Sequence, residues 1–145
     1  MPLKVEGSER LRLTRQELWR RLNDPQILGA CIPGCEGLER TADGSYRTAI
    51  TVVVGAVKGT YRGSVEYRDI EEPERCTIVV SARGEQGSIA GQGALSLVEA
   101  DGCTDVSYAG EFRLAGRVAG MGNRVAPAVS RRIIVDTLRN LEGSS

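Results

Sequence analysis

Histidine is absent from this chain of 145 residues. Because imidazole is the usual general base of Ser-His-Asp and Cys-His sites and a common zinc ligand, its absence excludes those classes of catalytic and metal site. An excess of one charge sign is lacking too, since 19 lysines and arginines balance 19 aspartates and glutamates. A nucleic-acid partner requires a basic surplus, so nucleic acid is not expected as a ligand.

Long hydrophobic runs are also absent. The segment from Met1 to Glu6 lacks the apolar core of a secretion signal, and the longest apolar stretch, 52–57, is far shorter than the roughly 20 residues of a membrane-spanning helix. We therefore expect a cytoplasmic protein. In that compartment the cysteines are expected to be reduced and packed, with no metal and no covalent cofactor; they are Cys31, Cys35, Cys76 and Cys103.

Hydrophobic periodicity divides the chain into four parts. Residues 3–13 alternate apolar and polar, which is typical of a half-buried strand. Thr14 begins a capping box, and Pro25 begins a second short helix. Alternating segments separated by turn residues fill 36–115 and predict about six more strands, whereas 121–141 returns to helical spacing.

This order of elements predicts an α+β fold. About seven antiparallel strands form one curved sheet wrapped around the long C-terminal helix, and two short helices follow the first strand. Residues 1–142 are expected to form a single domain, and 143–145 a frayed tail.

The composition also bears on how the interior is filled. The chain has 18 glycines against one tryptophan, four tyrosines and one phenylalanine. Glycines inside strands mark bends, and a bent sheet with few large side chains leaves empty volume. Two interpretations stay open. One is a ligand cavity with tyrosine hydroxyls in an apolar space; the other is a packed core whose tyrosines reach water at the sheet edge.

In the first interpretation, inward positions of the strands and of the last helix line the cavity. Each fully buried apolar contact is worth about 1.5–3 kcal/mol, and the hydroxyls of Tyr61, Tyr67 and Tyr108 are candidates to bind a ligand carbonyl. The predicted ligand-binding residues are Ile50, Val52, Tyr61, Val65, Tyr67, Ile78, Val80, Leu95, Leu97, Tyr108, Phe112, Met121, Val125 and Val129.

Three glycine-rich segments need separate interpretation. The segment 55–60 lacks the order of a phosphate-binding loop and predicts a hairpin turn. Gly120 and Gly122 open the last helix but lack a surrounding βαβ unit, so they predict a loop that lets this helix pack. The run 84–93 predicts a flexible or bulged hairpin, with a mobile lid over the cavity as the alternative.

Several segments together resemble one known family. The segments 22–25 (Leu-Asn-Asp-Pro) and 31–39 (Cys-Ile-Pro-Gly-Cys-Glu-Gly-Leu-Glu), the hairpin 54–63 and the small-residue run 84–93 are similar to the G-subunit family of carbon monoxide dehydrogenase. The resemblance covers nearly the whole chain and implies the helix-grip fold of the START-type (SRPBCC) superfamily, with a deep hydrophobic pocket between the sheet and the last helix.

The resemblance also implies a function. Members of the family are accessory proteins of molybdenum hydroxylases of the aerobic carbon monoxide dehydrogenase type, linked to membrane attachment and to electron transfer into the quinone pool. A bound quinone or other lipid-like molecule, a molybdenum hydroxylase complex as partner, and a place at the inner face of the membrane follow as expectations. The expected role is not catalytic.

Two other functions are compatible with the sequence. The first is a small enzyme of the cyclase or hydratase kind known in the same superfamily, with Glu9 or a tyrosine as acid or base. The second is an assembly factor that binds no ligand and presents an adhesive outer patch. Arginines of the last helix, such as Arg124 and Arg131, are exposed by default, with anionic lipid or an acidic enzyme surface as the alternative partner.

Overall fold

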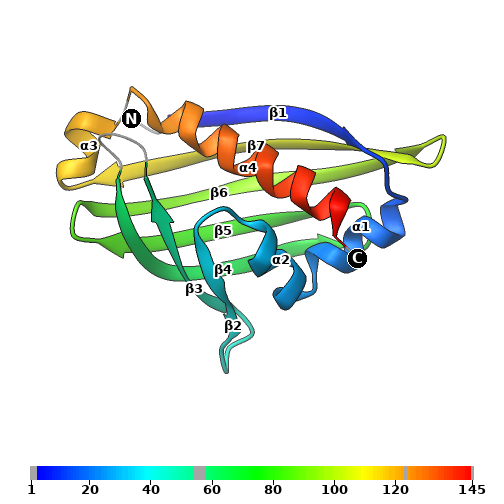
Figure 1. The fold of residues 1–145 in the computed structure, drawn as a ribbon, viewed down its shortest axis with the longest axis horizontal. Coiled ribbons are helices and arrows are strands. Elements are labelled where there is room, and N and C mark those ends of the chain that lie inside the picture. The colour runs from blue at the N-terminus through cyan, green and yellow to red at the C-terminus, as the bar shows by residue number, and fades with distance from the viewer. Residues whose placement is uncertain (1–2, 54–57, 123, 145) are drawn as a thin grey trace.

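The structure of the protein is a computed structural model that describes residues 3–53, 58–122 and 124–144, without the side chains of 121 and 122. Figure 1 shows the arrangement of the elements. They are β1 (Leu3–Leu11), α1 (Arg15–Leu22), α2 (Pro25–Cys31), β2 (Cys35–Arg40), β3 (Tyr46–Val52), β4 (Gly59–Glu71), β5 (Arg75–Gly84), β6 (Gly87–Ala100), β7 (Cys103–Ala115), α3 (Arg117–Gly122) and α4 (Ala126–Gly143).

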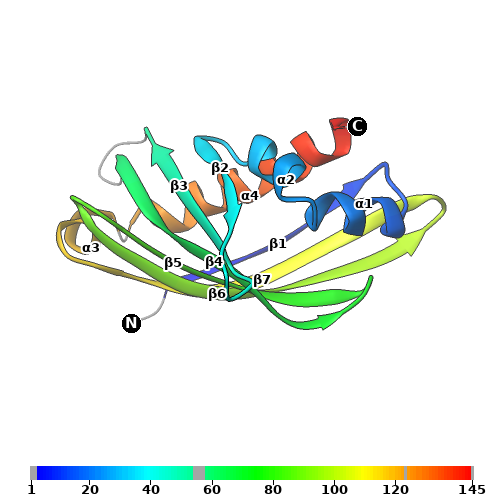
Figure 2. The same ribbon diagram turned by 90° about the horizontal axis from the view of Figure 1, so that it is seen from below.

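The strands in the described residues form one antiparallel sheet. Its seven strands have the order β1-β7-β6-β5-β4-β3-β2, so β1 pairs with the last strand while α1 and α2 carry the chain to the far edge. Figure 2 shows the sheet curving away below α4, with α1 and α2 on the same side as that helix. The predicted fold, a curved antiparallel sheet with a long C-terminal helix and two short helices after the first strand, is confirmed.

The predicted helix starts are confirmed by their hydrogen bonds. The Thr14 hydroxyl accepts from the Glu17 N–H at 3.2 Å, and the Asp24 carboxylate accepts from the Gln26 N–H at 3.0 Å. Each contact satisfies an N–H group that has no partner within its own helix. Pro127 lies in the first turn of α4, where its missing N–H costs no hydrogen bond.

Side chains from other elements fix the C-terminal half of α4. The Arg21 guanidinium, 12% exposed, donates to the carbonyls of Leu141 at 2.7 Å and Glu142 at 3.3 Å. A cation at these carbonyls also stabilises the negative end of the helix dipole. Asn140 donates to the Cys31 carbonyl at 2.8 Å and so joins α4 to the end of α2.

The carboxylate of Glu17 gives the fold a predictable acid response. Hydrogen bonds from Arg20 and Arg21, at 2.6 and 3.0 Å, lower its pKa from 4.5 to about 2. Because the folded-state pKa is depressed, this stabilisation is complete above about pH 4.5 and is lost as the pH falls through about 2. We expect the wild type to exceed Glu17→Gln in unfolding free energy at neutral pH by a small amount that vanishes in acid. Urea unfolding at several pH values measures this, and a pH-independent difference would contradict it.

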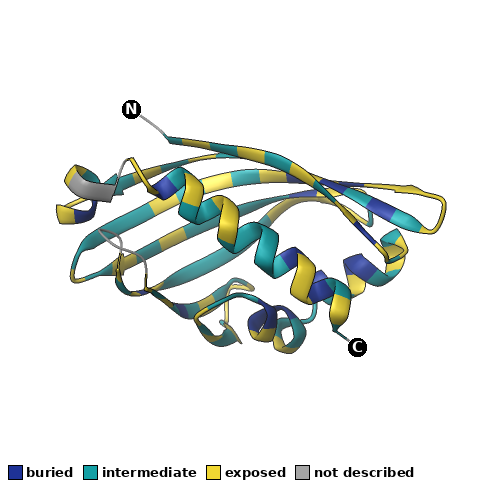
Figure 3. Ribbon diagram, turned by 45° about the horizontal axis from the view of Figure 1, so that its top comes forward, coloured by how far each residue is buried: buried dark blue, intermediate teal, exposed yellow. Residues whose placement is uncertain are grey.

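The packed core occupies only one end of the sheet. Figure 3 shows buried residues gathered near α1, α2 and the C-terminal end of α4, while the strands beneath the first half of α4 are mostly half-buried. The core residues are Leu11, Leu18, Trp19, Leu22, Leu28, Cys31, Cys76, Leu95, Leu97, Val106, Tyr108, Leu138 and Leu141.

Several local predictions need correction. The last helix begins at Ala126, later than the predicted start of helical spacing at 121. Gly120 and Gly122, which were predicted to form a loop, belong to the separate short helix α3. α4 continues through Gly143, where the Ser144 N–H donates to the Leu141 carbonyl, so the frayed tail predicted from 143 is too long. Residue 145 and the predicted turn at 55–57 lie outside the described residues.

The run 84–93 is neither bulged nor separate from the sheet. β5 and β6 pair without interruption from Arg75 opposite Ser96 to Gly84 opposite Gly87, leaving only 85 and 86 in the turn. The Val118 N–H donates to the carbonyl of residue 86 at 2.7 Å, which ties this turn to α3. Its glycines serve close packing of the strands; the predicted hairpin is confirmed, and the predicted bulge is wrong.

Candidate functional site

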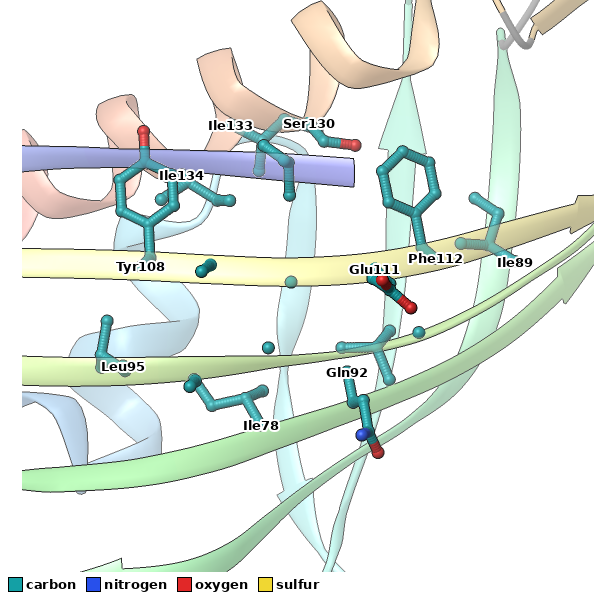
Figure 4. A pocket seen from close by; sticks show the side chains of 17 residues that line it. Ile78, Ile89, Gln92, Leu95, Tyr108, Glu111, Phe112, Ser130, Ile133 and Ile134 are labelled. Atoms are coloured by element: carbon teal, nitrogen blue, oxygen red, sulfur yellow. The ribbon is translucent and has the colours of Figure 1, made fainter. Parts of the chain in front are cut away.

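A cavity of about 340 Å³ lies between the sheet and α4, beside the packed core. Figure 4 shows it from close by, with β6 and β7 below and α4 above. Its wall is formed by strands β1, β5, β6 and β7 and by one face of α4; the lining residues are Val5, Ile78, Val80, Ile89, Gly91, Gln92, Gly93, Ala94, Leu95, Tyr108, Ala109, Gly110, Glu111, Phe112, Ser130, Ile133 and Ile134.

Two paired glycines account for the hollow. Gly93 of β6 lies opposite Gly110 of β7, and this row of inward positions continues into Ile78 on one side and Val5 on the other. A Cβ at Gly110 would lie 2.7 Å from the Gln92 carbonyl oxygen, so the close approach of the two strands requires glycine there. The middle of the sheet therefore has no side chains where it faces α4.

Two aromatic side chains bound this bare surface along β7. Tyr108 and Phe112 are four residues apart, and both extend into the cavity with Gly110 between them (Figure 4). Four residues of a strand span about 13 Å, enough for a flat ring to lie on the glycine surface between the two side chains. Gly7 of the neighbouring strand leaves room for the Tyr108 ring, since a Cβ there would be 2.5 Å from its hydroxyl oxygen.

The inward polar groups are hydroxyls rather than charges. Tyr108, only 9% exposed, points its hydroxyl toward α4, and this hydroxyl has no hydrogen-bond partner among the residues that the structure describes. Ser130 adds a second hydroxyl from α4 (Figure 4). Gln92 and Glu111 border the cavity through their backbone, but they are exposed and alternate with inward residues, so their side chains lie on the outer face. Such a wall suits an uncharged ligand that can accept a hydrogen bond.

The structure brings five of the predicted ligand-binding residues to the cavity wall: Ile78, Val80, Leu95, Tyr108 and Phe112. Leu97, 2% exposed, belongs to the packed core instead. The remaining strand positions face inward on β3 and β4 but lie away from the cavity wall, on the part of the sheet beyond β5; they are Ile50, Val52, Tyr61 and Val65. Ligand binding by any of these residues stays a prediction.

Tyr67 is placed differently from the prediction. Its hydroxyl donates to the Leu22 carbonyl at 3.0 Å, and its ring meets Tyr46 with centroids 6.0 Å apart. Burial raises the pKa of the phenol well above its ordinary value. Tyr67 therefore closes the end of α1, and its proton is not available to a ligand carbonyl.

The helix positions predicted to bind ligand differ from those that line this cavity. Val125 precedes α4 and is 37% exposed, Val129 is half-buried outside the cavity wall, and the Met121 side chain lies outside the described residues. Ser130, Ile133 and Ile134 line the cavity. Steps of three and four residues back from Leu141 and Leu138 reach these three positions, which is the spacing of one helix face. The helical periodicity of the sequence could therefore have predicted them.

The remaining lining residues that the sequence analysis missed are Val5, Ile89, Gly91, Gly93 and Gly110, together with positions that contribute backbone. The alternation of β1 already placed Val5 on the inner face. The glycines were recognised as bends, but only the register shows that Gly93 and Gly110 are neighbours.

The candidate acid–base group is held in an ion pair, and two of the cysteines are buried. Glu9 accepts from the Arg139 guanidinium at 2.8 Å and does not line the cavity. Burial raises the pKa values of the Cys31 and Cys76 thiols. In the described part of the chain no group of three or more cysteine, aspartate or glutamate side chains is placed to hold a metal ion.

Comparison with protein families assigns the chain. A sequence model of the carbon monoxide dehydrogenase G subunit (CoxG) matches residues 7–144. The chain belongs to this family. No curated protein sequence matches significantly.

Several solved structures have the same fold. A conserved protein from Geobacillus kaustophilus is 32% identical, with a TM-score of 0.91 over 97% of this chain and 93% of that one. An uncharacterised protein from Rhizobium leguminosarum (13% identity, TM-score 0.75, 99% and 97% covered) and the ZhuI aromatase/cyclase from Streptomyces sp. R1128 (19%, 0.70, 99% and 93%) share the fold. Among residues 3–53, 58–122 and 124–144, no helix of this CoxG family member has the length and apolar character needed to cross a membrane.

Proposed function

We propose that this CoxG family member binds a neutral, hydrophobic small molecule in the cavity, of the quinone or lipid-like class, and does so without catalysing a reaction. The observation that carries the proposal is the bare glycine surface of Gly93 and Gly110, enclosed by apolar side chains and faced by the Tyr108 hydroxyl. The START-type helix-grip superfamily, to which we assign the fold, commonly uses this space for ligands.

Burial supplies the affinity in this proposal. A flat ring covered on both faces hides about 150–250 Å² of apolar surface, which at about 25 cal/mol per Å² gives roughly 4–6 kcal/mol. The cavity, at about 340 Å³, is large enough for a ring with the first part of an alkyl tail. A charged ligand would enter without a counterion, at a prohibitive desolvation cost.

Family membership supports the partner. We infer that the ligand-binding protein serves an aerobic carbon monoxide dehydrogenase-type molybdenum hydroxylase, assisting its membrane attachment or electron transfer at the cytoplasmic face of the membrane. A catalytic role is less well supported, because the carboxylate of Glu9 is held by Arg139 and the inward-facing polar groups of the cavity wall are hydroxyls. If the cavity proves empty and unable to bind, a role in assembly replaces this proposal.

Replacing Tyr108 by phenylalanine tests the hydrogen bond within the site. Tyr108→Phe should weaken binding of decylubiquinone about fivefold, as expected for one neutral hydrogen bond, and leave binding of dodecylbenzene, which has no carbonyl, unchanged. Isothermal titration of both probes gives the comparison.

Tyr67→Phe is the matched control. It removes the same atom but breaks the bond to the Leu22 carbonyl, so it should lower the unfolding free energy by about 1 kcal/mol without changing either affinity. Equal effects of the two substitutions on decylubiquinone would place the ligand elsewhere.

A further inference from the structure

Charge is distributed unevenly along the long axis of the protein. Three segments, 58–62, 79–92 and 111–132, together carry eight basic residues and two acidic ones, Glu85 and Glu111. The basic residues are Lys58, Arg62, Arg83, Arg113, Arg117, Arg124, Arg131 and Arg132.

The opposite hairpins have the reverse charge. The segments 69–75 and 99–105 hold seven acidic residues and one arginine, Arg75. They connect β4 to β5 and β6 to β7 at the end covered by α1. A chain with zero net charge therefore has a basic end and an acidic end.

The basic segments meet in space. A Cβ at Gly59 would lie 3.5 Å from the Gln86 side chain, and the Val118 N–H donates to the Gln86 carbonyl at 2.7 Å. The start of β4, the β5–β6 turn and α3 therefore adjoin one another, and Figures 1 and 2 both show them at the end of the sheet away from α1. We call this the basic end. Ile89 and Phe112, the cavity residues farthest from the packed core, lie toward it.

Most cations of the basic end are not neutralised. Arg62 lies 3.8 Å from Glu36, and Arg132 lies 3.2 Å from Asp136. The others that are exposed and have no ion pair within the described residues are Lys58, Arg83, Arg113, Arg117, Arg124 and Arg131, of which Arg131 donates to the Glu6 backbone carbonyl. Exposed apolar side chains accompany them, since Val53 is 76% and Val125 37% exposed.

We infer that the basic end is a docking surface for a bilayer that contains anionic lipids. The inference rests on the proposed function, because a water-insoluble ligand reaches the cavity most directly where the protein touches the phase that dissolves it. Unpaired cations around exposed valines match the interface of such a bilayer, where phosphates lie outside the acyl chains. The acidic end is repelled by the same surface, so the charge separation also orients the cavity toward the lipid.

Sedimentation with vesicles tests the docking surface. The full chain is mixed with vesicles of phosphatidylcholine alone, or with 30% phosphatidylglycerol, at low and at physiological salt. We expect binding only to the anionic vesicles, weakening with salt. The triple variant Lys58→Gln, Arg117→Gln, Arg124→Gln should lower the partition coefficient about a hundredfold, at a tenfold loss for each 1.4 kcal/mol and about 1 kcal/mol for each charge.

The matched control removes the same charge from other parts of the surface. Arg12→Gln, Arg40→Gln, Arg47→Gln changes three exposed arginines that also have no ion pair in the described part of the chain. It should bind anionic vesicles almost as well as the wild type. An equal loss of vesicle binding in both triple variants would overturn the inference. So would a wild type that does not bind anionic vesicles at low salt, and an acidic protein surface would then be the candidate partner.

A second readout separates this inference from the proposed function. Both triple variants are titrated with decylubiquinone in vesicle-free solution, where the docking surface has no role, and unchanged affinity is expected. Lost vesicle binding with normal quinone affinity supports a separate docking surface. Normal vesicle binding by a protein that never binds quinone would contradict the proposed ligand and leave the docking surface standing.

Discussion

Gly93→Leu is expected to abolish ligand binding while the protein stays folded. A Cβ at this position would lie 3.4 Å from the Ala109 carbonyl oxygen and 3.5 Å from the Gly110 Cα, so the backbone can accept it at ordinary contact distances. The rest of the leucine side chain then occupies the space above the glycine surface. Losing the burial of one ring should reduce affinity for decylubiquinone at least about 100-fold, as measured by isothermal titration.

Ser96→Leu provides the control for this substitution. Ser96 lies on the same strand, is exposed and does not line the cavity, and alternation along the strand places its side chain on the outer face. The variant gains comparable bulk on the same strand without filling the cavity, so its affinity should equal that of the wild type. Circular dichroism and urea unfolding confirm that both variants are folded. A folded Gly93→Leu protein that still binds decylubiquinone tightly would show that the ligand does not bind in this cavity.

Leu97→Ala is expected to have the largest effect on stability. Leu97 is 2% exposed and lies opposite Val106 in the packed core. Truncating a leucine at such a position costs about 3 kcal/mol, because burial is lost and a new void remains. Urea unfolding should show this loss, while affinity for decylubiquinone should change less than about twofold at temperatures where the variant is folded, since Leu97 does not line the ligand cavity.

Ile133→Ala should show the opposite pattern. Ile133 is half-buried and lines the cavity from α4, so its truncation removes contact with the ligand more than contact within the core. We expect a loss of about 1 kcal/mol in unfolding free energy and an approximately tenfold weaker binding of decylubiquinone. If both substitutions lowered stability and affinity in the same proportion, the cavity would be an extension of the core.

Much of the fold could be predicted because its signals are local. Thr14 and Asp24 mark helix starts through their own hydroxyl and carboxylate groups, and Asp101 with Gly102 adopts the positive φ angles of a tight hairpin turn. Strict alternation fixed the inward face of each strand. The short helix α3 was missed because its glycines, a weak helical signal, are held in place by the contact of Val118 with the neighbouring turn.

The site was less predictable because a cavity depends on register. Nothing in the sequence states that Gly93 lies opposite Gly110, although this pairing creates the bare surface. Tyr67 and Tyr108 were equivalent in the alternation pattern, and only the fold directs one hydroxyl to the Leu22 carbonyl and leaves the other facing the cavity. The inward face of α4 is set by the anchoring of Leu141, whose carbonyl is bound by Arg21.

The central claim, a cavity that holds a neutral hydrophobic molecule, is tested most directly by native mass spectrometry. The protein is isolated from its own cells without detergent, and its mass is measured before and after denaturation, followed by extraction of whatever is released. The account predicts a bound, uncharged quinone or other lipid near one per chain, displaced or absent in Gly93→Leu. A wild-type protein that carries nothing and takes up no decylubiquinone when it is added would contradict it.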